Sequence, residues 1–297
     1  MNKQKKNFSK KQRRVRQLRR RVIGVSVIVL VLSFILDWNI TSQKNTNIKK
    51  HVDAAEVLTD TINGNVDKEK NSEVKKIEET TVNQEIKRKI DPSKPMIALT
   101  FDDGPGERTT ELLQVLERYE ARATFFLCGT SLSRKDLEVS KILKKMDELG
   151  CDIGNHTMDH QQLTLLTPKQ IRREVAGVNK IINKYTGHDA MFLRPPYGAG
   201  VRDNSVINNV NMPMVCWSVD TLDWKTKSKV KTMEAVLNEA EDGDIVLMHD
   251  IHSWSVDAAI EVIPRLVRKG YQLVTVSEMA EAKGVKLEKG KPYFEFK

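Results

Sequence analysis

Cysteine is scarce in this chain of 297 residues, which holds only Cys128, Cys151 and Cys216. The number is odd and none of the three belongs to a C-x-x-C pair, so the sequence offers neither a disulfide framework nor a thiolate metal site. Each cysteine lies in or beside an apolar, strand-like segment. We therefore expect three small, buried hydrophobic side chains.

Acidic residues are absent from residues 1–21, which hold eleven of the chain's 49 lysines and arginines. The rest of the chain is close to neutral, so the formal charge of +9 belongs to this basic tail. Aromatic residues are also scarce there, since Phe8 is the only one. A basic tail of this kind beside an apolar run is typical of contact with membrane phosphate, and we expect no nucleic-acid partner.

Charged residues are then missing from the apolar run Val22 to Leu36. Residues 22–40 contain one charged residue, Asp37. As a helix, they would reach about 28 Å, which is close to the hydrocarbon thickness of a bilayer. We expect this segment to be a signal anchor that spans the cell membrane once, with residues 1–21 in the cytoplasm and the remaining chain outside. The alternative is a cleaved signal peptide, which would give a secreted protein.

Tryptophan, phenylalanine and tyrosine are absent from residues 41–90, which are rich in asparagine, lysine, glutamate and threonine. Such a composition buries little apolar surface, so we expect an extracellular stalk or linker. A tether of this kind would let a membrane-anchored domain reach into a wall layer.

Short apolar runs alternate with helical segments in residues 91–297, which we interpret as one domain. Seven segments have the length and composition of strands: 96–101, 123–128, 151–154, 190–193, 214–219, 244–248 and 272–276. Five have apolar residues at helical spacing: 107–120, 132–149, 168–185, 231–239 and 256–268. The alternation predicts a parallel α/β sheet, either doubly wound or barrel-like. The length is short for a complete eight-fold barrel and favours a distorted, incomplete (β/α) barrel.

Two adjacent carboxylates, Asp102 and Asp103, follow the first predicted strand. Ionised neighbours repel each other, so a nearby cation, either a metal or an arginine, would hold both of them charged. An Asp-Gly hairpin turn is the alternative interpretation. The segment that follows has helical spacing, however, and loops that join strands to helices carry the chemistry of many α/β folds.

Two histidines, His156 and His160, follow the third predicted strand. Their spacing of four lets both imidazoles converge on one ion, and protein zinc sites commonly combine histidine with a carboxylate. A pair of surface histidines is the alternative. Thr157 stands where a zinc peptidase of the H-E-x-x-H type has glutamate, which disfavours that class.

Three further polar clusters follow later strands. The segment Arg194 to Gly198 reads R-P-P-Y-G, and its consecutive prolines stiffen the loop that presents the arginine. The segment Asp220 to Trp224 reads D-T-L-D-W, and Leu247 begins the sequence L-M-H-D. Alone, the first cluster could be a rigid surface turn and the last a structural histidine.

In chain order these segments read T-F-D-D-G-P, H-T-M-D-H, R-P-P-Y-G, D-T-L-D-W and L-M-H. Together they resemble the ordered signature of carbohydrate esterase family 4, the NodB-homology polysaccharide deacetylases, without a substitution. The resemblance covers about residues 97–249. It implies a distorted (β/α) barrel that uses a divalent metal to remove acetyl groups from N-acetylated or O-acetylated sugars.

The resemblance also implies which residues bind the metal and act as base. Asp103, His156 and His160 match the metal ligands of the family. Asp102 matches the general base, and Arg194 matches the residue that orients this base and holds it ionised. One divalent metal is implied, which we expect to be zinc, although cobalt or nickel would suit the same ligands.

The remaining matched residues are implied to act on the leaving group and the acetyl group. His249 matches the general acid, and Asp223 matches the carboxylate that tunes it. Trp224 and Leu247 match the walls of the acetyl-methyl pocket. The backbone N–H of Tyr197 matches a donor to the oxyanion.

The expected anchor and stalk favour a cell-wall substrate, so we expect N-deacetylation of N-acetylglucosamine in peptidoglycan by a monomeric enzyme. Alternatives of the same class are deacetylation of chitooligosaccharide or poly-N-acetylglucosamine and hydrolysis of acetylxylan esters. A different class is an inactive wall-binding scaffold. Such a scaffold would be expected to have lost a metal ligand or the base, and neither is lost in this sequence.

Overall fold

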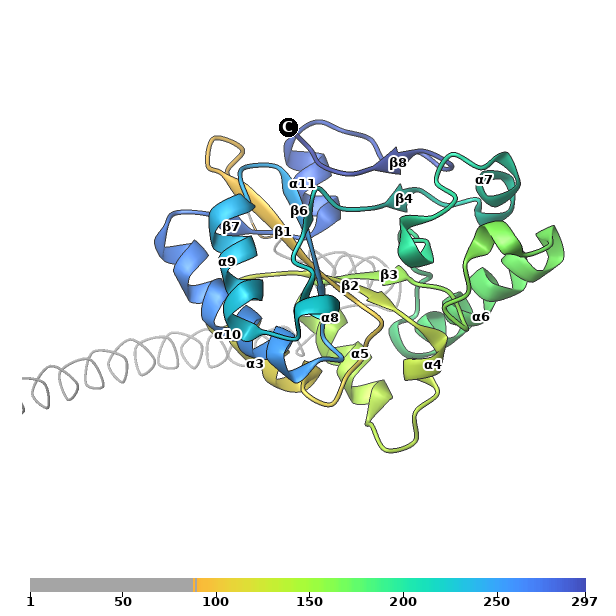
Figure 1. Ribbon diagram of the computed structural model, residues 1–297, viewed down its shortest axis with the longest axis horizontal. Coiled ribbons are helices and arrows are strands. Elements are labelled where there is room, and N and C mark those ends of the chain that lie inside the picture. The colour runs from red at the N-terminus through yellow and green to blue at the C-terminus, as the bar shows by residue number, and fades with distance from the viewer. Residues whose placement is uncertain (1–87, 89) are drawn as a thin grey trace, which may run out of the picture. The chain divides into compact units, whose positions relative to one another are not determined.

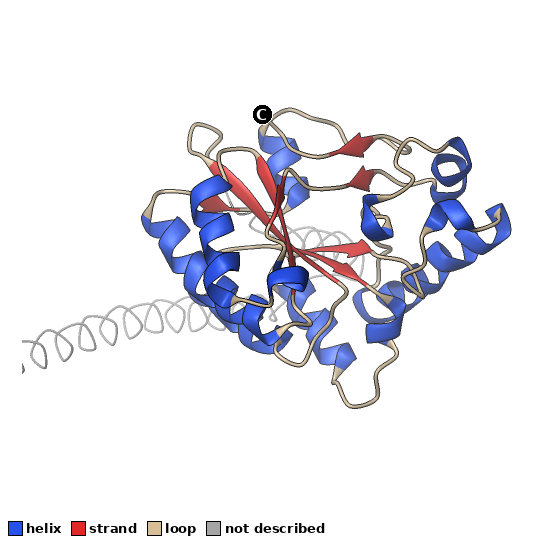
Figure 2. Cartoon of the chain, in the orientation of Figure 1, coloured by secondary structure: helices blue, strands red, loops and turns tan. Residues whose placement is uncertain are grey.

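A parallel β-sheet forms the centre of residues 88 and 90–297, the part of the chain that the computed structural model describes (Figures 1 and 2). Its strand order is β3-β2-β1-β6-β5, and β7 also pairs with β1. Its strands are β1 (Met96–Asp102), β2 (Thr124–Leu127), β3 (Asp152–Asn155), β5 (Val219–Asp220), β6 (Asp244–His249) and β7 (Gln272–Leu273). The predicted parallel α/β fold is confirmed.

A second, two-stranded sheet pairs β4 (Met214–Val215) with β8 (Pro292–Tyr293) in parallel. Isolated bridges place Leu193 between Asn155 of β3 and Met214 of β4. Within the described residues no continuous hydrogen-bond ladder closes the strands into a barrel.

The alternation of side chains along β1 places the two faces of the sheet in different cores. Ile97, Leu99 and Phe101 belong to the large cluster that packs against the helices. Met96 and Ala98 belong to a second cluster on the opposite face. Because strand side chains have a period of two, Asp102 continues the second series and emerges on that face at the carboxyl end of the strand.

The helices carry the residues that the helical spacing predicted to be buried, and consecutive members of the series α9, α10, α3, α5, α6 and α7 are in contact. In α3, for example, Leu112, Leu113 and Leu116 are buried. The longer helices are α3 (Thr109–Arg118), α5 (Val139–Glu148), α6 (Pro168–Thr186), α7 (Asn204–Val210), α9 (Lys229–Glu239), α10 (Ser253–Arg268) and α11 (Val276–Ala282). The short ones are α4 (Gly129–Leu132), α8 (Asp223–Thr226), η1 (Leu163–Leu165) and η2 (Pro196–Gly198).

Two strand predictions were wrong in extent. The predicted strand 214–219 is two strands, because the chain leaves β8 after Val215 and pairs with β6 only from Val219 onward. The predicted strand 190–193 provides only the bridges at Leu193. The prolines at 195 and 196 carry no backbone N–H, so a ladder could not continue through them.

Two further boundaries differ from the predictions. The predicted strand 272–276 ends at Leu273, because the hydroxyl of Thr275 caps α11 in a capping box with Glu278. The predicted helix 132–149 is interrupted by the polar segment 133–138 between α4 and α5.

The three cysteines are buried and unpaired, so the prediction of small buried hydrophobic side chains is confirmed. The expected basic tail, signal anchor and most of the stalk (residues 1–87 and 89) lie outside the described residues. Among the helices of residues 90–297, none is long and apolar enough to cross a membrane.

Candidate active site

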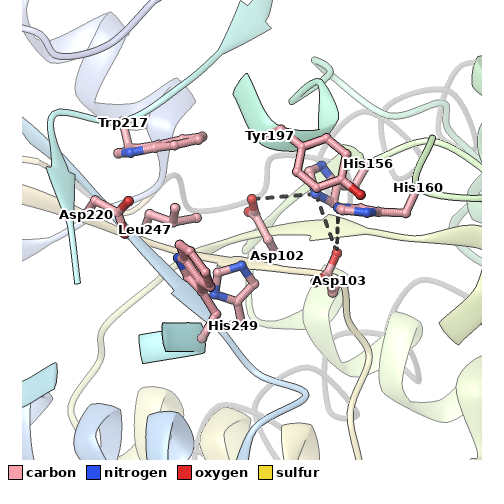
Figure 3. A pocket seen from close by; sticks show the side chains of 10 residues that line it. Asp102, Asp103, His156, His160, Tyr197, Trp217, Asp220, Leu247 and His249 are labelled. Carbon is pink, nitrogen blue, oxygen red and sulfur yellow. Dashed lines mark ion pairs between the residues drawn. The ribbon is translucent and has the colours of Figure 1, made fainter. Parts of the chain in front are cut away.

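A pocket of about 400 Å³ opens at the carboxyl ends of β1, β3 and β6 (Figure 3). The parallel register sets Asp102 beside His249, because these are partner residues on β1 and β6. The pocket is lined by Asp102, Asp103, His156, His160, Tyr197, Trp217, Asp220, Trp224, Leu247 and His249. Loops that are far apart in the chain therefore meet at one end of the sheet.

One side of the pocket holds a group of potential metal donors. Oδ1 of Asp103 lies 3.5 Å from Nε2 of His156 and 3.3 Å from Nε2 of His160. The three donor atoms all lie within 4.8 Å of one another. Oδ1 of Asp103 is buried and has no hydrogen-bond partner among the described residues. One carboxylate and two imidazoles that converge in this way fit a divalent metal.

His156 is held in the tautomer that a metal ligand needs. Its Nδ1 lies 2.7 Å from the carbonyl oxygen of Arg194, which can only accept, so Nδ1 carries the proton and Nε2 faces Asp103. Burial lowers the pKa of His156 to about 3, with Asp103 opposing the shift. The ring is therefore neutral at ordinary pH, and its Nε2 lone pair is available.

Asp102 has a cationic partner on the side away from the histidines. Nη1 of Arg194 lies 2.7 Å from Oδ1 of Asp102, and both side chains are buried. Burial raises the pKa of Asp102, while the charge and hydrogen bond of Arg194 oppose that rise. The net pKa stays above the ordinary value, which brings Asp102 closer to the strength of a useful base.

Arg194 itself is fixed from several directions. Its Nε donates to the carbonyl of Val215 at 3.0 Å, and Nη2 donates to the carbonyl of Cys216 at 2.6 Å. Nη1 also donates to the hydroxyl of Thr100 at 2.7 Å. The guanidinium carbon lies 4.0 Å from the centroid of the Phe126 ring. These contacts hold the guanidinium of Arg194 in its position beside Asp102.

The opposite side of the pocket holds a histidine–carboxylate pair. Nδ1 of His249 lies 2.8 Å from Oδ1 of Asp223, and the backbone N–H of His249 donates to Oδ2. The hydroxyl of Ser255 also donates to Oδ2 at 2.6 Å, and the indole N–H of Trp254 donates to the Asp223 carbonyl. Asp223 therefore occupies Nδ1 of the histidine and leaves Nε2 for the pocket.

Each member of the pair favours the charged form of the other, so His249 is a cation and Asp223 an anion. Burial lowers the pKa of His249, but the hydrogen bond and charge of Asp223 outweigh burial and raise it to about 9. Burial raises the pKa of Asp223, but the hydrogen bond and charge of His249 bring it below its ordinary value. The imidazole is therefore a cation near neutral pH and can give up a proton from Nε2.

Tyr197 lies over the histidines, with its ring centroid 4.9 Å from that of His160. Its backbone has a φ of 63°, a conformation that non-glycine residues rarely adopt. Its N–H has no acceptor among the described residues. Such strain is often found at functional positions, and here it leaves one backbone donor unused beside the pocket.

The structure brings together all ten residues that the sequence singled out. Eight of them line the pocket, whereas Arg194 and Asp223 are buried behind it, each against the side chain it was expected to orient. Trp224 is about half exposed and lies at the rim of the pocket, whereas Leu247 is buried and forms part of its wall.

Sequence reasoning missed Trp217 and did not assign a role to Asp220, which both line the pocket. Trp217 lies in the interval where the chain passes from β4 to β5, which was predicted to be one strand. The ring of Trp217 packs so closely on Gly198 that an added Cβ there would lie 3.1 Å from it. A tryptophan between two short apolar runs was the only signal available.

A model of the polysaccharide deacetylase family matches residues 89–215. A solved structure described as a T48 deacetylase with substrate is 40% identical, covers 69% of this chain and 100% of its own, and superposes with a TM-score of 0.64. The chain belongs to the polysaccharide deacetylase family.

Curated members of the family also match the chain. Peptidoglycan-N-acetylmuramic acid deacetylase PdaC of Bacillus subtilis is 38% identical over 224 residues, which cover 73% of this chain and 46% of PdaC. A peptidoglycan-N-acetylglucosamine deacetylase of Bacillus cereus is 35% identical over 194 residues, covering 63% of this chain and 69% of that protein. The chain therefore spans less than half the length of PdaC.

Proposed function

We propose that this protein is a metal-dependent deacetylase that hydrolyses N-acetyl groups of cell-wall glycan, with N-acetylglucosamine of peptidoglycan as the sugar. The observation that carries the proposal is the arrangement of the pocket. The donors Asp103, His156 and His160 lie on one side, the cationic imidazole of His249 lies on the opposite side, and the carboxyl of Asp102, paired with Arg194, lies between them (Figure 3). Metal-assisted hydrolysis of an amide uses these three functions around one carbonyl.

Asp103, His156 and His160 would hold the metal, for which we propose zinc. When bound, a divalent cation supplies a Lewis acid for the acyl carbonyl and makes a neighbouring water more acidic. The neutral, Nδ1-protonated His156 and the unpartnered Oδ1 of Asp103 suit this role. The same ligands would also accept cobalt or nickel, so metal analysis of the protein purified from its own cells tests the choice of zinc.

Asp102 is placed to act as the general base. It faces the pocket beside the donors and would accept a proton from the attacking water as the new carbon–oxygen bond forms. Arg194 keeps the carboxylate oriented, and three of its other N–H groups donate to Thr100 and to the backbone carbonyls of Val215 and Cys216. Asp102 would therefore act from a fixed position, because Arg194 is itself held in place.

Negative charge that develops on the carbonyl oxygen needs a donor that is already in place. The backbone N–H of Tyr197 meets this need, because the strained turn leaves it without an acceptor among the described residues. One such donor is typically worth about 3–4 kcal/mol of transition-state stabilisation.

His249 is placed to act as the general acid. As the carbon–nitrogen bond breaks, the leaving amine takes the proton from Nε2 of His249, and Asp223 stabilises the cation before that transfer. The products are acetate and a free amine on the sugar. Trp224 and Leu247 would contact the methyl group of the acyl chain, where an apolar wall favours acetyl over a charged group.

The names of the relatives support a peptidoglycan substrate, and they differ in the sugar. PdaC is named for N-acetylmuramic acid and the Bacillus cereus relative for N-acetylglucosamine. The experiment that tests the proposal is mass analysis of muropeptides from cells with and without the protein. We expect the glucosamine unit to lose the mass of an acetyl group replaced by hydrogen.

The same spectra separate the alternatives. Loss of acetyl from the muramic unit would replace the sugar that we propose. Unchanged muropeptides, together with acetate release from chitooligomers or acetylxylan, would reject the peptidoglycan substrate. An absence of acetate release from every glycan in the presence of zinc would favour a wall-binding scaffold.

We further propose that residues 22–40 anchor the protein in the cell membrane, with residues 41–90 as a stalk. The uncharged run of the first segment and the basic residues before it support this proposal. A cleaved signal peptide would instead release the domain into the medium, where an antibody against the C-terminal domain would find it.

A further inference from the structure

A buried carboxylate directly after the acid of the pocket has no role in the mechanism above. Asp250 follows His249 at the end of β6 and is 1% exposed. Its Oδ1 has no hydrogen-bond partner among the described residues. A buried acceptor without a partner costs about 1–3 kcal/mol, which offsets what the hydrogen bond to the other oxygen of Asp250 contributes to stability.

Asp250 contacts the loop that follows the base and the first metal donor. That loop runs from Asp103 through Gly104 and Gly106 to the start of α3. A Cβ added to Gly104 would collide with the carboxylate of Asp250, and one added to Gly106 would collide with the Asp250 carbonyl oxygen. Only glycine at both positions allows the loop to pack this closely against the end of β6.

A hydrogen-bonded link fixes this contact. The N–H of Gly106 donates to the hydroxyl of Thr109 at 2.8 Å. Because that N–H occupies an acceptor site of the hydroxyl, the single hydroxyl proton is free to point to Oδ2 of Asp250, to which it donates a hydrogen bond. Thr109 is fully buried, so no water competes for this proton.

The link joins the two halves of the active site. Asp102 and His249 are register partners on adjacent strands, and beyond them the chain continues into the loop 103–106 on one side and into Asp250 on the other. Pairing between β1 and β6 stops at these residues. Ser131 and Cys128 hold the loop from the β2 side, by donating to the carbonyls of Asp103 and Gly104. The contact with Asp250 is the one that ties the loop to the end of β6, which carries the acid.

We propose that Asp250 is a positioning residue that, through Thr109, fixes the loop 103–106 against the end of β6 and so sets the geometry of Asp103 as a metal ligand opposite His249. The inference rests on the proposed function for its catalytic consequence. Its consequence for metal binding does not depend on the identity of the substrate.

The test measures Zn²⁺ affinity by calorimetry and steady-state kinetics on an N-acetylated glycan for variants of the full chain. Asp250→Ala and Thr109→Val each remove one end of the link. We expect each to raise the dissociation constant for Zn²⁺ about 10- to 100-fold. We expect kcat to fall by up to about 10²-fold with KM little changed, because the reacting groups are displaced and the sugar contacts are not.

Rescue and control variants distinguish positioning from general destabilisation. Asp250→Asn keeps an oxygen for the Thr109 hydroxyl, so it should keep most of the affinity and turnover. Asp257→Asn removes a carboxylate that pairs with Arg108 at 2.7 Å, one residue from Thr109 but outside the link, and should match the unmodified protein. The Thr109→Val/Asp250→Ala double variant should lose no more than either single variant, because both changes break one connection.

Several results would overturn the proposal. They are unchanged Zn²⁺ affinity in Asp250→Ala, losses that add in the double variant, or an Asp257→Asn variant as weak as Asp250→Ala. If Asp250→Ala does not fold, Thr109→Val decides alone, since it has nearly the same shape as the original side chain. An unmodified protein without deacetylase activity would reject the proposed function, whereas the Zn²⁺ affinities would still test the positioning role.

Discussion

Asp102 and Asp103 are neighbours in the chain, and each has a partner that the other lacks. Asp102 pairs with Arg194 at 2.7 Å, and Asp103 lies 3.3 Å from His160. Nε2 of His156 lies between them, 3.7 Å from Asp102 and 3.5 Å from Asp103. Asp103 has a φ of 69°, a left-handed backbone conformation that non-glycine residues rarely adopt. One dipeptide can therefore supply two functions, because Arg194 is the counter-charge of the first carboxylate and a bound cation would be that of the second.

Substitution of these two residues should separate metal binding from turnover. We expect Asp103→Ala to lose Zn²⁺ because one of three ligands is removed. We expect Asp102→Asn to retain Zn²⁺ and lose about 10²- to 10⁴-fold in kcat, because the amide cannot accept the proton from water. Calorimetry with Zn²⁺ and acetate-release kinetics check both. If Asp102→Asn lost the metal as well, Asp102 would belong to the ligand set.

The Asp223–His249 pair predicts the alkaline limb of the pH–rate profile. Burial lowers the pKa of His249, but Asp223 raises it to about 9 overall, so activity should fall as pH rises through about 9. Asp223→Asn should move this limb down toward the ordinary value of about 6.5. Rates of acetate release between neutral and alkaline pH check the shift. A limb at the same pH in both proteins would exclude His249 as the acid.

The proton of His249 also contributes to the free energy of unfolding. Because the pKa of His249 is raised in the folded chain, this contribution is stabilising. The folded chain keeps the His249 proton up to about pH 9, whereas the unfolded chain releases it near pH 6.5. The stabilisation is therefore complete below about pH 6.5 and is lost as pH rises through about 9. Urea unfolding at several pH values should show this loss, and Asp223→Asn should lack it.

At the scale of secondary structure elements, β2 and β3 approach each other closely beneath the active site. A Cβ added to Gly154 of β3 would lie 2.5 Å from the ring of Phe126 on β2, and that ring stacks on Arg194. The small residue on one strand is therefore what allows an aromatic ring on the next to support the arginine.

Gly154→Ala should destabilise the fold by about 1–3 kcal/mol, because the aromatic ring cannot move without disturbing the buried arginine. Gly177→Ala in α6 is a matched control. Its added Cβ would meet only the flexible side chain of Met158 at 3.1 Å, and alanine favours a helix interior by about 0.5–1 kcal/mol. Urea midpoints of the two variants check the difference, and equal midpoints would contradict this account of the packing.

The elements also show what a sequence can and cannot predict. The long apolar strand β1 and the periodic helix α6 were predicted to within a residue, because their patterns repeat over many positions. The break between β4, which pairs with β8, and β5, which pairs with β6, was not predicted. A switch from one partner strand to another leaves no periodic pattern in the sequence. The capping box of Thr275 and Glu278 was a readable signal of a helix start, and the strand prediction for 272–276 overlooked it.

The active site was more predictable than its support. Polar residues at strand ends and their resemblance to a known signature identified the ten site residues. The partners of Arg194 and Asp223 include backbone carbonyls and N–H groups, which have no side-chain signature. The sequence therefore predicted which groups lie together at the pocket, and the structure was needed to show what holds them.

At the scale of the whole molecule, Arg88–Lys297 form one compact unit that contains the entire pocket. We expect deletion of residues 22–40 to move the protein from the membrane fraction to the soluble fraction without changing kcat on soluble chitooligomers. Immunoblots of the fractions and acetate-release assays check this expectation. A protein that is released from the membrane without the deletion would indicate cleavage.

Arg194 has a consequence for the order in which the chain folds. Its guanidinium cannot give up its proton, so it stays hydrated until its acceptors are assembled. Two of these acceptors lie 92 and 94 positions away along the chain, and the others lie 21 and 22 positions away. We therefore expect closure of this region to be a late step in folding, because β1 must meet both Val215 of β4 and Cys216, which follows it. Chains that bury Arg194 would, by the same step, orient the proposed base, Asp102.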